Sequence, residues 1–441
     1  MTKTKAFAQV LIALLVLGIF SALPFSMGAL VTFSVGDVSA VPLGEGIFSP
    51  ESPGMGGKTI NDFRGGLLTF DMDMIDAENI ERDGRGIWVA VIDTGMLPNW
   101  DYFFPKARIE GDLGIGFYED PVTGDFYETD WDIALSGHGT HVASTIIGYN
   151  FAGTPIDGIA PLAKIIPIKV LWWEYSQPHR ASGSVRMVKA GIDHVTAIKA
   201  ANPDMKIVIN LSLGAGVPIL EIEEAINDAI DQGVIVVAAA GNAGYDGMDW
   251  PGAYPQVISA GWAGWTTQFT VGGWWHADVP EDLMTPSVWT GAFGPIAGTQ
   301  VYMDYSSGRE LEGQELDVVA PGGWVVGPYW NPDLGPLPDD PRQCYFYVGG
   351  TSMATPHVAG TAALMIEKKG KPLVQSDIET ILKATADIAP VTFPNGHLWG
   401  LPEPFAAIEL DPWGTLWLEN WDYNAVGQGF LQADAAVEMA G

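Results

Sequence analysis

The stretch that most restricts the fold is Gly349-Gly350-Thr351-Ser352-Met353-Ala354-Thr355-Pro356-His357-Val358-Ala359-Gly360. A glycine pair lets the backbone turn sharply and lets another segment approach it closely. Ser352 then opens an apolar, alanine-rich run that predicts a buried helix, with Pro356 in its first turn, where a missing N–H costs little. A serine there has its hydroxyl at the positive end of the helix dipole, where developing negative charge is stabilised. On this stretch alone, an N-cap serine on a core helix is an equally good interpretation.

Two further stretches supply the partners that a serine nucleophile needs. One is the apolar run Trp88-Val89-Ala90-Val91-Ile92-Asp93-Thr94-Gly95, which predicts a buried parallel strand with Asp93 at its C-terminal end, where open α/β sheets hold their chemistry. The other is Ser136-Gly137-His138-Gly139-Thr140-His141, which predicts a helix that begins near His138. A serine hydroxyl becomes nucleophilic when a base takes its proton, and the base works best when a carboxylate fixes its tautomer. Asp93, His138 and Ser352 provide these three groups.

The three stretches resemble the signature segments of the subtilisin-like serine proteases, the subtilase family, over roughly residues 80 to 440. The resemblance implies that Ser352 is the nucleophile, His138 the base and Asp93 the carboxylate that orients the base. A fourth segment, Ala238-Ala239-Ala240-Gly241-Asn242, resembles the family's oxyanion segment and implies that the Asn242 side chain donates to the oxyanion.

The resemblance also identifies residues that contact the substrate. The segment Asn210-Leu211-Ser212-Leu213-Gly214 resembles the strand that pairs with a bound peptide, and residues 239–241 resemble the wall of the primary specificity pocket. The implied substrate-binding residues are Ser212, Leu213, Gly214, Ala239, Ala240 and Gly241. Because this wall is small and uncharged, we expect large apolar or aromatic side chains to be preferred before the cut bond. The floor of the pocket is not located by the sequence.

Downstream of Asp93, apolar runs alternate with amphipathic stretches, which predicts an α/β fold. The resemblance implies a mostly parallel central sheet flanked by helices, the subtilisin-like three-layer architecture. We predict strands at residues 163–171, 206–213, 234–240 and 257–260, and further helices at 182–200, 218–232, 374–386 and 432–439. Two additions to a minimal chain of this kind are a polar, aromatic stretch at 117–132 and a tryptophan-rich insertion near 262–299. We expect the insertion to pack on the core, although tryptophans at this density also suit a lid or a polymer-binding surface.

The N-terminus has the layout of a targeting segment. Lys3 and Lys5 precede an apolar stretch from about Ala6 to Phe20, and small residues follow. Residues 1–40 are therefore interpreted as a secretory signal peptide or, if retained, a membrane anchor. Residues 41–80 are assigned to a short pro-segment or N-terminal arm, and 81–441 to the peptidase domain. Both alternatives place the peptidase outside the cytoplasm, either secreted or anchored at the cell surface, and only a retained anchor would contact the membrane.

Charge restricts the partners. With 21 Lys and Arg against 53 Asp and Glu, the chain has a net charge of -32, which argues against nucleic-acid binding. The resemblance implies structural calcium as the cofactor, for which the chain has acidic loops at Asp120–Asp132 and Asp278–Asp282, with no catalytic metal and no ligand assigned. Cys344 is the single cysteine, so no internal disulfide forms. We expect a monomer that acts on proteins or peptides.

Other readings account for less of the sequence. His141 and His138 lack a third zinc ligand nearby, and Cys344 lacks the flanking glycines of a nucleophile. An α/β-hydrolase esterase would need a Gly-x-Ser-x-Gly elbow, but Ala354 occupies the second glycine position. A catalytically inactive relative used for cell-surface binding remains an alternative, which hydrolysis of casein would exclude. The leading hypothesis is a secreted serine endopeptidase.

Overall fold

The computed structural model describes residues 31–35, 39–43, 65–175, 180–265, 268, 279, 287–291, 294–298, 301–369, 373–386, 405–410, 416–421 and 423–441. Most of the predicted signal segment and much of the tryptophan-rich stretch lie outside this range. Within it, no helix has both the length and the apolarity needed to cross a membrane.

A mostly parallel sheet of nine strands forms the centre of the described part of the chain. In spatial order the strands are β16 (Val301–Met303), β13 (Ile258–Trp265), β12 (Ile235–Ala239), β11 (Lys206–Leu211), β3 (Ile87–Asp93), β8 (Lys164–Lys169), β4 (Ile115–Glu119) and β5 (Phe126–Thr129), with β17 (Val318–Pro321) also paired to β13. The pairs from β13 through β12, β11 and β3 to β8 are parallel, whereas β13–β16 and β4–β5 are antiparallel. The predicted α/β class and mostly parallel sheet are confirmed.

Burial on both faces explains why the central strands are continuous apolar runs. Along β3, Val89 and Val91 belong to the apolar cluster on one face, and Ala90 and Ile92 to the cluster on the other. Because the parallel strands point the same way, the residues that follow β3, β11 and β12 meet at one edge of the sheet. Asp93 is the last residue of β3, so the catalytic candidates of the sequence gather at that edge.

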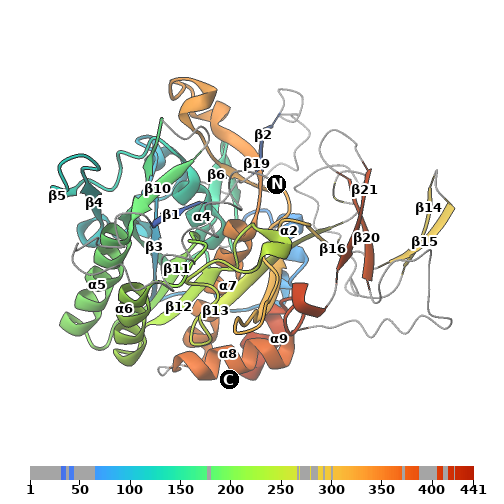
Figure 1. Ribbon diagram of the computed structural model, residues 1–441. Helices are drawn as coiled ribbons and strands as arrows, with labels where there is room; N and C mark the ends of the chain where they lie inside the picture. Colours follow the sequence, from blue (N-terminus) through green and yellow to red (C-terminus); the bar gives the residue numbers. More distant parts are fainter. Residues whose placement is uncertain are drawn as a thin grey trace, which may run out of the picture.

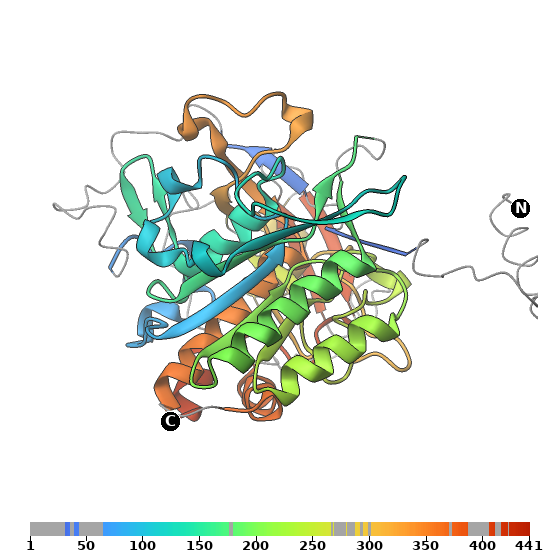
Figure 2. The same ribbon diagram turned by 90° about the vertical axis from the view of Figure 1, so that its left-hand side faces the viewer.

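Helices cover both faces, as Figures 1 and 2 show. The helices that pack on one face are α5 (Val185–Ala201) and α6 (Leu220–Asp231). Those on the other side are α4 (His138–Ile147) and α7 (Thr351–Lys369), with α8 (Gln375–Thr385) and α9 (Ala433–Met439). Helix α7 contacts β3, β11, β12 and β13, so it is the buried helix that the alanine-rich run predicts.

Smaller elements border the main sheet. Two three-stranded sheets have the orders β1–β10–β9 and β18–β19–β2. Their strands are β1 (Thr32–Ser34), β10 (Ala181–Ser184), β9 (Trp172–Trp173), β18 (Val325–Pro328), β19 (Tyr345–Gly349) and β2 (Ser39–Pro42). The remaining pairs are β6 (Tyr149–Phe151) with β7 (Thr154–Ile156), β14 (Ser287–Gly291) with β15 (Gly294–Gly298), and β20 (Phe405–Leu410) with β21 (Leu416–Trp421). The short helices α2 (Phe70–Asp73) and α3 (Trp100–Phe103) complete the framework.

Three expectations about local structure need correction or detail. The helix predicted at 182–200 begins at Val185, because Ala181–Ser184 pair with other strands as β10 and the Ser184 side chain caps the helix by accepting from the N–H of Met187. Helix α7 begins at Thr351, so Pro356 lies in the interior of the helix and not in its first turn. The stretch at 117–132 forms most of the β4–β5 hairpin at the sheet edge.

Candidate active site

Asp93 and His138 are in direct contact. His138 is the first residue of α4, and its Nδ1 lies 2.8 and 2.9 Å from the two carboxylate oxygens of Asp93. Both side chains are fully buried, and the N–H of Thr94 donates to Asp93 Oδ1 at 2.6 Å. The carboxylate holds the imidazole with Nδ1–H directed at it, which leaves the lone pair on Nε2. His138 Nε2 has no hydrogen-bond partner among the described residues.

The turn after β3 fixes α4 against the strand end. Thr94 Oγ1 donates to the carbonyl of Ser136 at 3.0 Å and accepts from the N–H of Gly139 at 2.9 Å. A Cβ on Gly139 would lie 2.5 Å from the carbonyl oxygen of Gly95 and 3.2 Å from Asp93 Cβ. Glycine is therefore required here for His138 to reach Asp93.

Ser352 is held against Ser212 and not yet against the imidazole. Ser352 Oγ donates to the carbonyl oxygen of Ser212 at 3.2 Å, and Ser212 Oγ donates to the carbonyl oxygen of Ser352 at 2.9 Å. In a regular helix that second acceptor would receive the N–H of residue 356, but Pro356 has none. The Ser212 hydroxyl replaces the missing donor. Bonds between a nucleophile and its base are often long or absent until substrate binds.

Asn242 follows β12 at the same sheet edge. Its Oδ1 accepts from the N–H of Thr351 at 3.0 Å and from Thr351 Oγ1 at 2.9 Å. These two bonds fix the orientation of the amide and leave Nδ2 without an acceptor among the described residues. The N–H of Ser352, in the first turn of α7, also lacks an intrahelical acceptor. Two donors are thus available next to the serine hydroxyl.

The strand predicted to pair with a peptide is already paired, with the chain's own β1. The N–H of Ser34 donates to the carbonyl of Gly214 at 2.9 Å, and the N–H of Gly214 donates back at 3.0 Å. On its other side, β1 is antiparallel to β10, and the N–H of Val35 donates to the carbonyl of Ala181 at 3.3 Å. Phe33 is fully buried in the same apolar cluster as Leu213. An extended segment therefore lies between β10 and the residues that follow β11, two residues from Ser212, whose carbonyl accepts from Ser352 Oγ.

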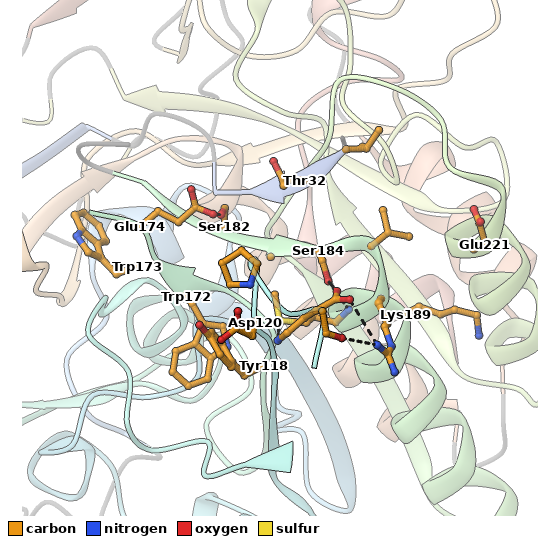
Figure 3. Close-up of a pocket in the computed structure, with 18 residues that line it drawn as sticks. Thr32, Tyr118, Asp120, Trp172, Trp173, Glu174, Ser182, Ser184, Lys189 and Glu221 are labelled. Atoms are coloured by element: carbon orange, nitrogen blue, oxygen red, sulfur yellow. Dashed lines mark hydrogen bonds and ion pairs between the residues drawn. The ribbon is translucent and has the colours of Figure 1, made fainter. Parts of the chain in front are cut away.

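The next described segment, β2, pairs with the strand that precedes Ser352. β2 is antiparallel to β19, with Ser39 opposite Gly349, close in sequence to Ser352. Beyond the N-terminal end of β1 there is a groove of about 800 Å³. Figure 3 shows Thr32, Trp172 and Ser184 around it, where Glu119 accepts from Ser184 and pairs with Arg186 at 3.6 Å. This groove therefore lies beside β10 and the N-terminal end of β1.

Two other histidines and the cysteine have structural contacts. His141 Nε2 lies 3.1 Å from the carbonyl oxygen of Val325, and burial lowers the pKa of His141 to about 3. His357 bridges the carbonyl of Met353 at 2.8 Å and Asp71 at 3.2 Å. Both imidazoles are thus held by hydrogen bonds within the protein. Cys344 is buried, and desolvation raises the pKa of its thiol to about 11, which opposes thiolate chemistry.

Sequence reasoning missed two charged residues near this edge. Lys169 is buried beside Asp93 in the β3–β8 register, and it donates to the carbonyls of Thr94 at 3.0 Å and Leu171 at 2.8 Å. Desolvation lowers the pKa of Lys169 to about 7. A lysine at the end of an apolar strand was the signal available in the sequence. The other residue is Asp249, in a loop that the motifs did not locate.

One carboxylate group among the described residues has the spacing of a cation site. It consists of Glu315, Asp317 and Glu379. Lys383 Nζ lies within it, 2.5 Å from Glu315, 2.6 Å from Asp317 and 2.6 Å from Glu379. The ammonium already supplies the positive charge there, so this group does not fit calcium.

Comparisons with known proteins agree with this geometry. Residues 84–405 match the model of the Subtilase family. The chain is 32% identical over 311 residues to Subtilisin Savinase of Lederbergia lenta, a match that covers 70% of this chain and 87% of that protein. It is also 32% identical over 311 residues to an Alkaline protease of Shouchella clausii, a longer protein of which the match covers 61%. Among solved structures, fervidolysin from Fervidobacterium pennivorans, a keratinolytic enzyme related to subtilisin, matches with a TM-score of 0.53 and 23% identity over 84% of this chain and 45% of that chain.

Proposed function

We propose the catalytic residues of this chain, which belongs to the Subtilase family and is therefore a serine-type endopeptidase. Ser352 is the nucleophile, His138 is the base, and Asp93 orients the base. The observations that carry this proposal are the bonded Asp93–His138 pair and the extended segment β1, held antiparallel at Gly214, two residues from Ser212, whose carbonyl accepts from Ser352 Oγ. A protein that cleaves peptide chains needs a place for an extended backbone next to its nucleophile, and the pairing of β1 with Gly214 supports such a place here.

In the proposed reaction, Ser352 Oγ turns from Ser212 toward His138, gives its proton to Nε2 and attacks the peptide carbonyl carbon. Asp93 stabilises the imidazolium that forms. The oxyanion accepts hydrogen bonds from Asn242 Nδ2 and the N–H of Ser352. The imidazolium then protonates the leaving amine as the C–N bond breaks. Water, deprotonated by His138, hydrolyses the resulting ester and restores Ser352.

Substrate would bind as β1 binds. Ser212, Leu213 and Gly214 would supply one strand of a sheet, β10 would supply the other, and the peptide would lie between them. Ala239, Ala240 and Gly241 would wall the pocket for the side chain before the cut bond. An apolar preference follows from these walls considered alone. An esterase has no need of two flanking strands, and this favours the peptidase.

We assign residues 65–80 to the folded peptidase unit, together with 81–441, because Phe70 and Met72 are buried in the main core. Asp71 also bonds His357 on α7. This favours an N-terminal arm over a removable pro-segment for that part of residues 41–80. The proposal keeps secretion directed by the N-terminal segment, or anchoring at the cell surface if it is retained, and a monomeric enzyme.

Calcium binding is proposed without assigned ligands, since the carboxylate group that Lys383 neutralises does not fit the ion. We expect a higher unfolding midpoint with calcium than with a chelator, because an ion that binds only the folded state stabilises it by mass action. An unchanged midpoint would end this part of the proposal.

The triad is tested by labelling and mutation. Phenylmethylsulfonyl fluoride should modify Ser352 and abolish casein hydrolysis. The variant Ser352→Ala should neither react with the reagent nor hydrolyse casein. Thr355→Ala, a hydroxyl removal on the same helix that leaves the proposed chemistry intact, is the control for folding. Hydrolysis that survives in Ser352→Ala, or label on another serine, would refute the assignment.

A further inference from the structure

The register of β1 locates the residue that precedes the cut bond. In an antiparallel pair, the residue two positions after the one opposite Gly214 lies opposite Ser212. The carbonyl of Ser212 is the acceptor of Ser352 Oγ, at 3.2 Å. A substrate residue opposite Ser212 therefore presents its own carbonyl to the nucleophile, and its side chain meets the surroundings of Gly214 and Gly241.

A carboxylate lies in these surroundings. A Cβ on Gly241 would come 2.5 Å from Oδ2 of Asp249, and a Cβ on Gly214 would come 3.0 Å from the same atom. Asp249 is tied to this place by its backbone, because its N–H donates to the carbonyl of Ala240 at 2.8 Å. The two glycines, one after β11 and one after β12, leave the space that the Asp249 side chain enters.

The Asp249 carboxylate makes no hydrogen bond or ion pair with another described residue. It is partly buried, and desolvation raises the pKa of its carboxyl, against a smaller opposite effect of the positive charge of Arg180. A partly buried carboxylate without a partner is costly to the folded state. A cationic ligand would remove that cost, whereas an acidic one would add repulsion.

From these contacts we infer that Asp249 determines specificity, by selecting substrates with lysine or arginine immediately before the cut bond. The aliphatic stem of such a side chain would pass the small apolar walls Ala239 and Ala240, and its charged end would meet Asp249. The inference rests on the proposed peptidase function. It replaces the apolar preference that the walls alone suggested.

The test compares tetrapeptide anilides that differ only in the residue before the cut bond, with Lys, Arg, Phe, Leu or Asp at that position. Purified active protein is assayed beside Asp249→Asn, which keeps the shape and removes the charge. Asp246→Asn, an exposed acid in the same loop, is the matched control for net charge. Benzamidine, a small cation, is titrated as a competitive inhibitor of all three proteins, and thermal unfolding verifies that each is folded.

We expect the native protein to have its highest kcat/KM on Lys or Arg. Asp249→Asn should lose roughly 10- to 100-fold of its preference for Lys over Phe, the range for a charged hydrogen bond, and should bind benzamidine more weakly. Asp246→Asn should change neither. A native preference for Phe or Leu, or an equal Lys-to-Phe ratio in native protein and Asp249→Asn, overturns the inference and leaves the peptidase intact. Folded native protein that hydrolyses no anilide and no casein instead overturns the proposed function itself.

Discussion

The exchange of hydrogen bonds between Ser212 and Ser352 leads to a quantitative prediction about Ser212→Ala. The Ser212 hydroxyl donates to the Ser352 carbonyl at 2.9 Å and accepts from Asn210 Nδ2 at 2.9 Å. Both partners are buried, and the proline at 356 provides no alternative donor for the carbonyl. Leaving a buried polar group unsatisfied costs about 1–3 kcal/mol, so losing both partners should lower the free energy of unfolding by about 2–6 kcal/mol.

Pro356→Ala separates the two contributions. It restores an N–H at residue 356 that donates to the Ser352 carbonyl, so Ser212→Ala should then cost only the Asn210 part, about 1–3 kcal/mol. The coupling in this double-mutant cycle should be about 1–3 kcal/mol, and any packing loss from Pro356→Ala cancels between its two arms.

The measurement is urea unfolding followed by tryptophan fluorescence, in a Ser352→Ala background that prevents self-digestion. That background keeps the main-chain carbonyl on which the prediction depends. The slope m should stay constant if only stability changes. Equal costs of Ser212→Ala with proline or alanine at 356 would show that the hydroxyl does not replace the helix bond, and the reasoning would fail.

Three more outcomes are expected. Asn242→Ala should lower kcat by about 10²–10³, a magnitude borrowed from subtilisin, with KM nearly unchanged, and a raised KM at constant kcat would identify a positioning residue instead. Because the pKa of His141 falls to about 3 on folding, only the unfolded chain takes up its proton between the ordinary pKa of 6.5 and that value. The free energy of unfolding should therefore decrease by on the order of 1–2 kcal/mol as the pH is lowered from 6.5 to 5. In His141→Gln, urea unfolding at each pH should give a weaker dependence on pH. An unchanged dependence would argue against a buried neutral imidazole. Lys383→Met should destabilise by about 3–5 kcal/mol, because it leaves a buried Asp317 without its cation, and a loss below 1 kcal/mol in urea unfolding would contradict the buried ion group.

The residues of the site that could be predicted from sequence are those whose position follows from a single element, at the end of one strand or the start of one helix. An apolar run that ends in Asp93 predicts a buried strand of a parallel sheet, and a glycine pair before Ser352 permits the sharp turn that the chain makes at Gly350, between β19 and α7. The start of α5 could not be predicted in the same way. The sequence predicts the helix from residue 182, but Ser182 and Ser184 are both suitable N-caps, and the pairing of residues 181–184 with β1 and β9 makes Ser184 the cap.

The same limit explains Asp249 and the N-terminal segment. Asp249 belongs to no motif, and its place beside Gly214 and Gly241 depends on a loop that folds back after Gly241, so that the Asp249 N–H reaches the Ala240 carbonyl next to the segment that follows β11. Phe33 and Val35 continue the apolarity of the targeting stretch. An apolar residue indicates removal from water but does not distinguish a bilayer from a protein cleft, so pairing with Gly214 was not foreseeable.

The placement of β1 has a consequence for every rate measured on the full chain. If substrate binds in the proposed way, β1 is a tethered segment that competes with it at an effective concentration on the order of millimolar, whatever the protein concentration. If only a fraction f of molecules has β1 displaced, the apparent dissociation constant of any peptide rises by 1/f, so an f of about 0.01 would raise it roughly 100-fold. Because this factor is the same for all peptides, it cancels in the ratio between two substrates. Dilution leaves it unchanged, while substitutions that weaken the pairing of β1 should raise kcat/KM for every peptide by the same factor.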